Sequence, residues 1–508
     1  MVNRLRLALF VVAAGIVAGC QYRPMMIAPN QRKALDRAIV ETPTGFQLEP
    51  YVRYLTDPAA IACDNRGNLL IAEGSTTDSS PLIFGFRPDG SRFNIYPVGR
   101  IPNIPWLPIF RLYGPIGGMV VDQNWIYISH RDRNGRGVIT AFDYEGHHRT
   151  VVADLPAQGE YSVTDLAIGP NGKLYFGVGS ATNSGVVGLD DWDIGWVRQY
   201  PKFSDLAGAD LKLLGYRFDT PNPIAGLFGP GETAVTAPFQ PFATGNRLRI
   251  RKSDKPTGAI YSVNPMGGGL EVIAHGIRNP DGLAFNEYGR LYMTDQGMQL
   301  RGTRPVKDDP DSLLWVLKGT WYGFPDFSAD LRPITELPQP PAEMLIKTGY
   351  PELSNLIDHE ASGLLRPDRS TLVRGVFPAL SGAAKMDFVR ASGPFSEYRG
   401  SAVVALSGDQ APFATSDHKL IGPIGYKVVR VDVDSREVQD FVFNTQGAPS
   451  SHLHHHPECL ERPIDVKFAP DGSMYILDLG IVDYKTGSPH VHPGTGKIFR
   501  LVPTNITH

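Results

Sequence analysis

The stretch GIRNPDGLAFNEYGRLYMTDQG, residues 276–297, decides the fold. Two short apolar runs flank a glycine-containing turn at residues 286–289, a pattern that predicts a β-hairpin. Because hairpin strands are antiparallel, Arg278 and Asn279 before the first strand must lie at the same end as Asp295 after the second. The stretch therefore predicts apolar strands that carry a cluster of polar side chains on their loops.

This hairpin pattern occurs six times along the chain. The other five copies begin near residues 60, 118, 164, 385 and 464. Six such units predict an all-β fold, a six-bladed β-propeller, over residues 46–505. The spacing also predicts two long, partly helical insertions at about residues 185–250 and 302–384, with helix expected over residues 203–214. Long aromatic loops over a propeller are typical of a cap or an interface.

Composition narrows the choice of partners. The chain has 508 residues, of which 54 are glycine and 43 proline, as expected for many short strands and turns. The net charge of −3 offers no basic footprint, so we expect no nucleic-acid partner.

The N-terminus reads as a targeting segment. Arg4 and Arg6 precede an apolar run too short to span a bilayer, and residues 17–20, VAGC, resemble the bacterial lipobox. This resemblance implies a lipoprotein signal peptide over residues 1–20, lipidation of Cys20 and a tether over residues 21–45. It further implies an exported lipoprotein attached to the membrane by its lipid, on the periplasmic side of the outer membrane or at the cell surface. An ordinary secretory signal is the alternative.

Two further cysteines fall in the predicted propeller. Cys63 and Cys459 lie near opposite ends of the folded region, and an exported protein meets an oxidising compartment. We predict a disulfide between them that joins the first and last repeats; two buried free thiols are the alternative.

Histidines are concentrated near the C-terminus. His454 and His456 precede the last repeat, and His490 and His492 follow its hairpin. Histidines at alternating positions can converge on a metal ion, so these four are metal-ligand candidates, with a solvated loop as the alternative.

Several segments resemble the glucose/sorbosone dehydrogenase family. The matching residues are those of the opening stretch, together with residues 169–175, 319–325 and 425–431 and Arg462 with its following proline. The resemblance implies a six-bladed quinoprotein that uses pyrroloquinoline quinone (PQQ) and calcium. It places Arg278 and Asn279 beside the quinone and Arg462 on a cofactor carboxylate. Lys385, predicted at the same face, is a further candidate cation for the cofactor carboxylates.

The chain departs from this family where a base is needed. Tyr161 stands at the position of the family's basic histidine, and a tyrosine with a reference pKa of about 10 is a poor base. We expect Tyr161 to contact the substrate instead. Asp295, His130 or the C-terminal histidines are the alternative bases.

Three functional hypotheses follow. The first is a quinoprotein-like oxidoreductase that oxidises a sugar, an alditol or a related small molecule and passes electrons to an acceptor that the sequence does not identify. The second is a calcium-dependent lactonase with oxygen ligands from Glu73, Asn183, Asn279 and Asp478. The third is a non-catalytic propeller that binds a partner through its large loops.

Overall fold

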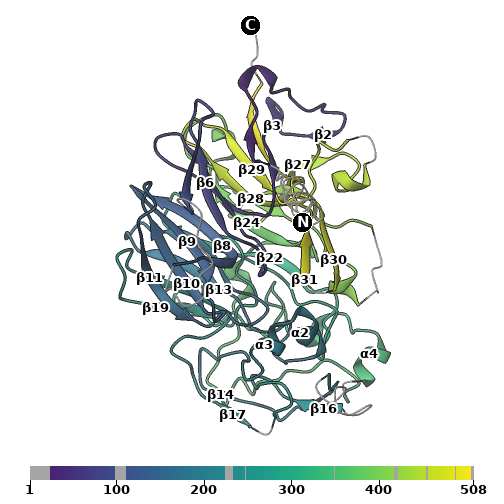
Figure 1. Ribbon diagram of the computed structural model, residues 1–508. Coiled ribbons are helices and arrows are strands. Elements are labelled where there is room, and N and C mark those ends of the chain that lie inside the picture. Colours follow the sequence, from purple (N-terminus) through teal and green to yellow (C-terminus); the bar gives the residue numbers. More distant parts are fainter. Residues whose placement is uncertain are drawn as a thin grey trace, which may run out of the picture.

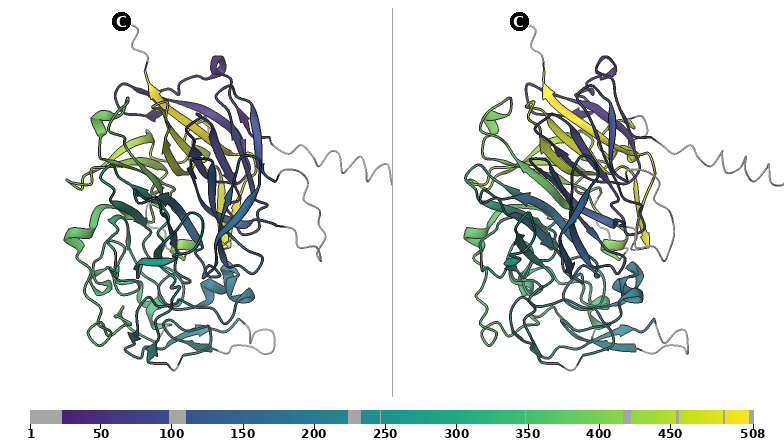
Figure 2. Two further views of the ribbon diagram at one scale, coloured as in Figure 1. Left: turned by 90° about the vertical axis from the view of Figure 1, so that its left-hand side faces the viewer. Right: turned by 60° about the vertical axis from the view of Figure 1, so that its left-hand side comes forward.

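The protein is a six-bladed β-propeller with a cap on one face (Figures 1 and 2). The computed structural model describes residues 23–97, 110–223, 233–245, 247–347, 349–416, 422–453, 456–486 and 488–504. Within these residues, six sheets of four or five antiparallel strands lie around a central channel. The first strands of successive sheets contact one another, and the last sheet contacts the first, so the ring is closed.

Blades one to three follow in chain order. Blade one consists of β4 (Pro58–Cys63), β5 (Leu69–Glu73), β6 (Leu82–Phe86) and β7 (Arg92–Tyr96). Blade two consists of β8 (Tyr113–Asp122), β9 (Trp125–Arg131), β10 (Gly137–Phe142) and β11 (His148–Leu155). Blade three consists of β12 (Val163–Ile168), β13 (Leu174–Val178), β18 (Ala259–Val263) and β19 (Glu271–His275).

Blades four to six complete the ring. Blade four consists of β20 (Leu283–Phe285), β21 (Leu291–Asp295), β22 (Pro310–Trp315) and β23 (Val373–Ala379). Blade five consists of β24 (Ala383–Phe388), β25 (Ala402–Leu406), β26 (Lys427–Val431), β27 (Val438–Asn444) and the edge strand β2 (Val40–Glu41). Blade six consists of β28 (Pro463–Phe468), β29 (Met474–Asp478), β32 (Gly496–Pro503), β3 (Phe46–Leu55) and the edge strand β1 (Met25–Met26).

All six predicted hairpins are present as the first two strands of a blade. In the opening stretch, β20 and β21 pair with Leu283 opposite Met293 and Phe285 opposite Leu291. Leu283, Leu291 and Met293 are buried in one cluster with side chains of blade three. The apolar alternation therefore packs neighbouring blades together, which leaves the loops at the strand ends to carry polar groups.

The ring closes through strands from both ends of the chain. The N-terminal strand β3 pairs with the C-terminal strand β32 as the outer part of blade six. Before it, β1 pairs with β3 and β2 pairs with β27 of blade five. Within residues 21–45, which were predicted to form a tether, Met25–Met26 and Val40–Glu41 are therefore edge strands that extend two sheets. The predicted signal peptide and Cys20 lie outside the described residues.

The two insertions form the cap, which lies at the lower end of the molecule in Figures 1 and 2. The first runs between β13 and β18. It holds α2 (Leu189–Ile194), α3 (Trp196–Gln199), β14 (Leu211–Lys212), β15 (Phe218–Pro221), β16 (Thr233–Thr236) and β17 (Arg249–Ile250). The second runs between β22 and β23 and holds the short helices η3 (Ile334–Glu336), α4 (Ala342–Ile346) and α5 (Arg369–Leu372).

Two predictions about these insertions need correction. Helix predicted at residues 203–214 lies instead at 189–199, because the carbonyl groups of Leu206 and Ala207 accept hydrogen bonds from Thr257 and Ser253 across the cap. In addition, the second insertion was predicted to occupy residues 302–384, but β22 and β23 within that range complete blade four.

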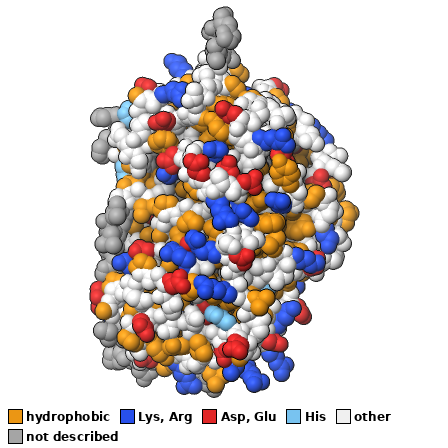
Figure 3. Space-filling model, turned by 180° about the vertical axis from the view of Figure 1, so that it is seen from behind, with side chains coloured by type: hydrophobic (Ala, Val, Ile, Leu, Met, Phe, Trp, Pro, Cys, Tyr) orange, Lys and Arg blue, Asp and Glu red, His pale blue; other side chains and the backbone are white. Residues whose placement is uncertain are grey.

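The remaining elements and the surface complete the description. The short helices η1 (Pro29–Gln31), η4 (Ser396–Tyr398), η5 (Phe413–Thr415) and η6 (Ser450–His452) lie in loops, and β30 (Val482–Thr486) and β31 (Ser488–Val491) form a hairpin between β29 and β32. In the part of the chain that the structure describes, no helix is long and apolar enough to cross a membrane. Seen from behind, basic and acidic side chains are interspersed over the surface (Figure 3).

Buried side chains on the inner strands hold neighbouring blades together. The carboxylate of Asp465 in blade six accepts a hydrogen bond from the backbone N–H of Ile61 in blade one at 3.0 Å. Asp165 in blade three accepts from Leu283 N of blade four at 3.2 Å. These contacts satisfy backbone groups at the inner edges of the sheets, where burial would otherwise leave them unpaired.

Both propeller cysteines are free thiols, so the predicted Cys63–Cys459 disulfide is wrong. Cys63 ends β4, at the turn between β4 and β5. Cys459 precedes β28, at the start of the first strand of its blade. The first strands of the blades run in the same sense along the channel, so the two thiols lie at opposite ends of the ring and cannot approach within bonding distance.

The free thiols give a direct test. Without any reductant, protein denatured in guanidinium should react with a thiol reagent at both Cys63 and Cys459, as identified by peptide mass spectrometry. Recovery of a disulfide-linked peptide that joins the two residues would contradict this assignment.

The Asp465 contact predicts a measurable effect on stability. Asp465→Ala removes the acceptor for Ile61 N and the partner of Lys467, whose ammonium lies 3.0 Å from the carboxylate. Breaking a buried pair of this kind should lower the free energy of unfolding by about 3 kcal/mol, measured by urea denaturation. Asp89→Ala, at an exposed turn, is the control and should change it by less than about 0.5 kcal/mol. Equal effects of the two substitutions would refute the proposed role of Asp465 in holding blade six to blade one.

Candidate functional site at the channel mouth

Carboxylates at the ends of second strands hold the loops that enter the first strands. Asp295, at the end of β21, accepts hydrogen bonds from Asn279 N at 2.7 Å and Arg278 N at 3.4 Å. Glu73 accepts from Thr56 N at 2.7 Å in blade one. This arrangement places Arg278 and Asn279 at the mouth of the channel, as the hairpin predicted.

Asp478 has the same role in blade six. Its two carboxylate oxygens accept hydrogen bonds from Glu461 N at 2.7 Å and Arg462 N at 3.0 Å. In three blades, a carboxylate at the end of the second strand therefore accepts hydrogen bonds from backbone N–H groups of the loop that enters the first strand.

Arg278 is a buried cation beneath the mouth, with only 2 % of its surface exposed. Its Nε donates to the carbonyl of Asn183 and its Nη2 to Asn183 Oδ1, both at 2.9 Å. Its Nη1 donates to the carbonyl of Gln296 at 3.4 Å. The ring of Tyr161 lies 4.8 Å from the guanidinium carbon, a cation–π contact. The structure thus brings Arg278 and Tyr161 together, as predicted.

A second arginine, which sequence reasoning missed, organises the cap side of the mouth. Arg301 forms an ion pair with Asp190 at 2.6 Å, a very short one with Glu160, and a hydrogen bond from its Nε to Gln299 Oε1 at 2.7 Å. Although burial acts in the opposite direction, the guanidinium groups of Arg301 and Arg278 lower the pKa of Glu160. The only hint in the sequence was the adjacency of Glu160 to Tyr161.

Arg462 lies across the mouth in blade six and fixes a loop of blade five. Its Nη1 donates to the carbonyls of Ser407 at 2.9 Å and Gly408 at 3.0 Å, and its Nη2 donates to that of Asp409 at 3.2 Å. The rings of Tyr426 and Tyr484 each lie 5.0 Å from its guanidinium carbon. Arg278 and Arg462 therefore stand on the same face of the ring, at the entrances of blades four and six.

Lys385 is the cation at the mouth that is not engaged. It lies near the start of β24, on the inner strand of blade five, and only 6 % of its surface is exposed. Its ammonium makes no hydrogen bond or ion pair with any residue that the structure describes. Its positive charge lowers the pKa of Asp281 and of Asp165, although burial raises both on balance. Lys385 Nζ is not among the buried unpaired atoms, so the ammonium is open to the channel and can meet an anionic ligand.

The predicted bases differ in availability. Burial raises the pKa of the Tyr161 hydroxyl far above its usual value, so it stays neutral. Burial raises the pKa of Asp295 to about 7, but both of its oxygens are held by backbone N–H groups. His130 is buried, and its ring nitrogens contact Arg131 O at 2.6 Å and Thr140 Oγ1 at 2.8 Å. None of these three offers a free basic atom to a substrate.

The C-terminal histidines do not form a metal site among the described residues. His454 lies outside them, and His490 and His492 stand on the β30–β31 hairpin with their rings 5.6 Å apart. His492 pairs with Asp483 at 3.0 Å. The only described group of three or more metal-binding side chains from His, Cys, Asp or Glu is Asp143, Glu145 and His147, at an exposed turn of blade two. These are not the predicted ligands, and that group lies away from the mouth.

Three of the four proposed lactonase ligands are also hydrogen-bonded within the fold. Glu73 and Asp478 hold backbone N–H groups, as described above, and Asn183 Oδ1 accepts from Arg278 and from Gln299 N, each at 2.9 Å. Three of the four predicted calcium ligands are therefore engaged in the fold, Glu73 through Oε1 only, whereas Asn279 Oδ1 has no hydrogen-bond partner among the described residues.

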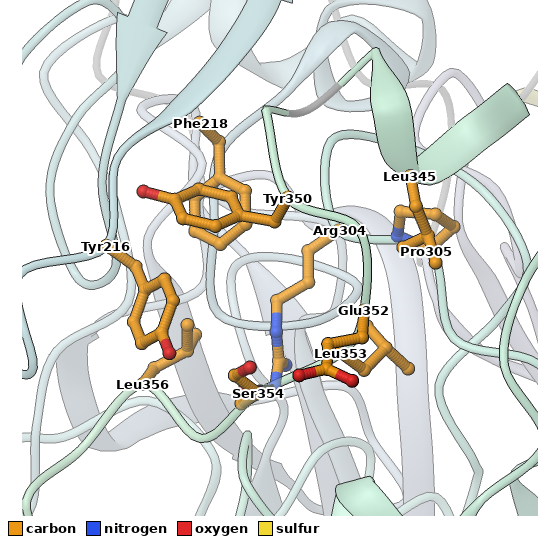
Figure 4. Close-up of a pocket in the computed structure, with 10 residues that line it drawn as sticks. All are labelled: Tyr216, Phe218, Arg304, Pro305, Leu345, Tyr350, Glu352, Leu353, Ser354 and Leu356. Carbon is orange, nitrogen blue, oxygen red and sulfur yellow. Dashed lines mark hydrogen bonds between the residues drawn. The ribbon is translucent and has the colours of Figure 1, made fainter. Parts of the chain in front are cut away.

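The cap contains its own small cavity, separate from these residues. Figure 4 shows Tyr350 lying across Phe218, with the side chain of Arg304 beneath; the two rings lie 5.2 Å apart. The cavity volume is about 10 Å³, room for about one water molecule. Arg304 is held by the carbonyls of Ser184, Pro325 and Ser354 at 2.9–3.1 Å, so this cavity serves the packing of the cap.

The fold and the mouth together define a propeller with a polar site at one end of its channel. No protein-family model matches the chain, and no curated protein sequence matches it. Solved structures do match. The PQQ domain of pyranose dehydrogenase from Coprinopsis cinerea has a TM-score of 0.51 and 14 % identity, over 92 % of this chain and 97 % of that one.

Two other solved structures bear on the hypotheses. A family AA12 carbohydrate-active enzyme from Trichoderma reesei has a TM-score of 0.50 and 14 % identity, over 92 % of this chain and 98 % of that one. A gluconolactonase from Xanthomonas campestris has a TM-score of 0.39 and 11 % identity, over 94 % of each chain, which is too low to carry an argument. The resemblance to PQQ-dependent sugar dehydrogenases is therefore confirmed for the fold.

The buried carboxyl group of Asp295 predicts a pH dependence of stability. Because the pKa of Asp295 is raised to about 7 in the folded protein, its protonated form favours folding. Relative to Asp295→Asn, the wild type should therefore lose stability as the pH rises from about 4 to about 8, by roughly 3 to 4 kcal/mol in total. Urea denaturation of both proteins at each pH measures the difference. A constant difference over that range would contradict the burial of an ionisable carboxyl here.

Proposed function

We propose that the protein is an oxidoreductase that oxidises a sugar, an alditol or a related small molecule with bound PQQ. The observation that carries the proposal is the unengaged Lys385 ammonium at the channel mouth, on the same face as Arg278 and Arg462. The fold supports it, because the similar solved structures include a PQQ domain.

The residues at the mouth fit an anionic cofactor. Besides Lys385, Arg462 Nε is a buried N–H donor without a hydrogen-bond partner among the described residues. PQQ carries three carboxylates, for which lysine and arginine are the natural partners. Lys385 and Arg462 would hold carboxylates, and the second Nδ2–H of Asn279, whose first donates to Gln296 Oε1, would donate to the quinone end. Arg278, which Asn183 holds in place, would contribute its positive charge from beneath the mouth. When bound, the cofactor supplies a two-electron acceptor.

The surroundings of the proposed reaction follow from the remaining groups. Tyr161, half-buried above Arg278, would contact the substrate. Calcium, which the sequence resemblance also implies, has no assembled set of three acidic or histidine ligands at the mouth among the residues described.

We also propose that the protein is exported and anchored by a lipid on Cys20, so that the substrate and the electron acceptor meet it outside the cytoplasm.

Titration with PQQ tests the proposal. A chain that begins at residue 23 should bind the quinone saturably and then reduce an electron-accepting dye when aldoses or alditols are supplied. Lys385→Met removes the unengaged charge and should weaken quinone binding about 10- to 100-fold, the effect of one charge-assisted hydrogen bond. Quenching of protein fluorescence measures the binding, and a dye assay measures turnover.

The control is Lys202→Met, a neutralisation on the exposed surface of the cap, which should leave quinone binding unchanged. Absence of quinone binding by the wild type, together with absence of dye reduction on every sugar, would reject the proposed function.

A further inference from the structure

Oxidation of a hydroxyl group requires a proton acceptor that the substrate can reach. As described above, Tyr161 stays neutral, Asp295 and His130 are fully engaged, and His492 is paired with Asp483 on a hairpin. Glu160 has one oxygen without a partner, Oε2, but that atom is buried from solvent. Neither carboxylate considered so far, Asp295 or Glu160, therefore offers a substrate a free and accessible oxygen.

Asp281 meets the requirement. It lies two residues after Asn279, at the entrance of β20, and its side chain is half-buried. Only one oxygen, Oδ2, is bonded, by a long 3.4 Å hydrogen bond from Gln296 Nε2. The other oxygen, Oδ1, makes no hydrogen bond to a described residue and is not among the buried unpaired atoms, so it is not fully enclosed. Asp281 thus offers a reachable oxygen beside the Arg278–Asn279 pair.

Gln296 links Asp281 to the groups proposed to hold the quinone. Its Oε1 accepts a hydrogen bond from Asn279 Nδ2 at 3.1 Å, while its Nε2 donates to Asp281 and to the carbonyl of Ala383 at 3.0 Å. One amide therefore fixes Asp281 relative to Asn279 and to blade five. The remaining charges that act on Asp281 come from Lys385 and Asp465 on the inner strands of blades five and six.

We propose that Asp281 is the catalytic base of this protein and accepts the proton of the substrate hydroxyl group on Oδ1. The proposal rests on the proposed function and names a residue that the sequence analysis did not consider. Burial raises the pKa of Asp281, with Lys385 acting in the opposite direction, and a raised carboxylate pKa suits proton transfer near neutral pH.

The proposed step balances as follows. The O–H bond of the substrate breaks and its proton passes to Asp281. The C–H bond on the carbon that bears this hydroxyl group would break, and bound PQQ would supply the two-electron acceptor for the hydride. The carbon–oxygen double bond of the product forms from the electrons of the O–H bond. Asp281 then returns its proton to the reduced acceptor or to water, and the positive charge of Lys385 nearby stabilises the carboxylate that remains.

Asp281→Asn, Asp281→Glu and Asp254→Asn, a substitution on the exposed surface of the cap, form the test set, each assayed with bound PQQ. Asp281→Asn should lower kcat for dye reduction at least about 100-fold while quinone affinity changes less than about 3-fold. It should also abolish the decline of kcat at acid pH that titration of the base produces. Asp281→Glu should recover part of the rate, and Asp254→Asn should match the wild type.

A second measurement does not depend on turnover. Carbodiimide-driven coupling of an amine to carboxyl groups, read by peptide mass spectrometry, should modify Asp281 in the folded wild-type protein and leave Asp295 unmodified. Failure to modify Asp281, or an Asp281→Asn protein with the kcat and pH profile of the wild type, would overturn the assignment while the proposed function stands. A wild type that binds no quinone and reduces no dye would overturn both.

Discussion

The structure depends on hydrogen bonds between buried side chains and the backbone N–H groups at the inner ends of the blades. Asp465 bridges blade six to blade one, and Asp165 bridges blade three to blade four. At the mouth, Asp295 and Asp478 fix the loops that precede the inner strands. Because each bond satisfies a backbone donor that would otherwise be buried and unpaired, the ring and the positions of its loops are set together.

That constraint also explains which residues are free to act. A carboxylate that holds a loop cannot easily accept a proton from a substrate, and an arginine that is bonded to carbonyl groups binds a ligand only with its remaining donors. Of the charged groups at the mouth described above, Lys385 and Asp281 make the fewest hydrogen bonds and ion pairs with described residues, although both lie on inner parts of the ring. The proposed roles in binding the cofactor and accepting a proton therefore fall to side chains that the fold does not need for its own hydrogen bonds.

The architecture was predictable from the sequence because each hairpin is local. The turn at residues 286–289 and the alternation around it specify two strands without reference to the rest of the chain, and six copies specify the ring. The end of the hairpin at which Arg278 and Asn279 lie also followed from strand direction. By contrast, the edge strands Met25–Met26 and Val40–Glu41 within the predicted tether were not foreseen, because Val40–Glu41 pairs with β27, about 400 residues away, and Met25–Met26 pairs with β3 without a hairpin turn signal. The disulfide prediction failed because it rested on the positions of Cys63 and Cys459 near the two ends of the folded region, and not on the strand directions that place them at opposite ends of the channel.

The site was predicted only in part, for the same reason. Glu160 and Arg301 are 141 residues apart and meet because the loop before β12 and the loop between β21 and β22 lie together at the mouth, and no spacing rule connects them. The measurement that tests the account most directly is a crystal structure of the protein with PQQ and a sugar. The account predicts quinone density between Lys385 and Arg462, with the sugar hydroxyl group within hydrogen-bonding distance of Asp281 Oδ1. Density for the quinone in the cap, or a sugar turned away from Asp281, would contradict it.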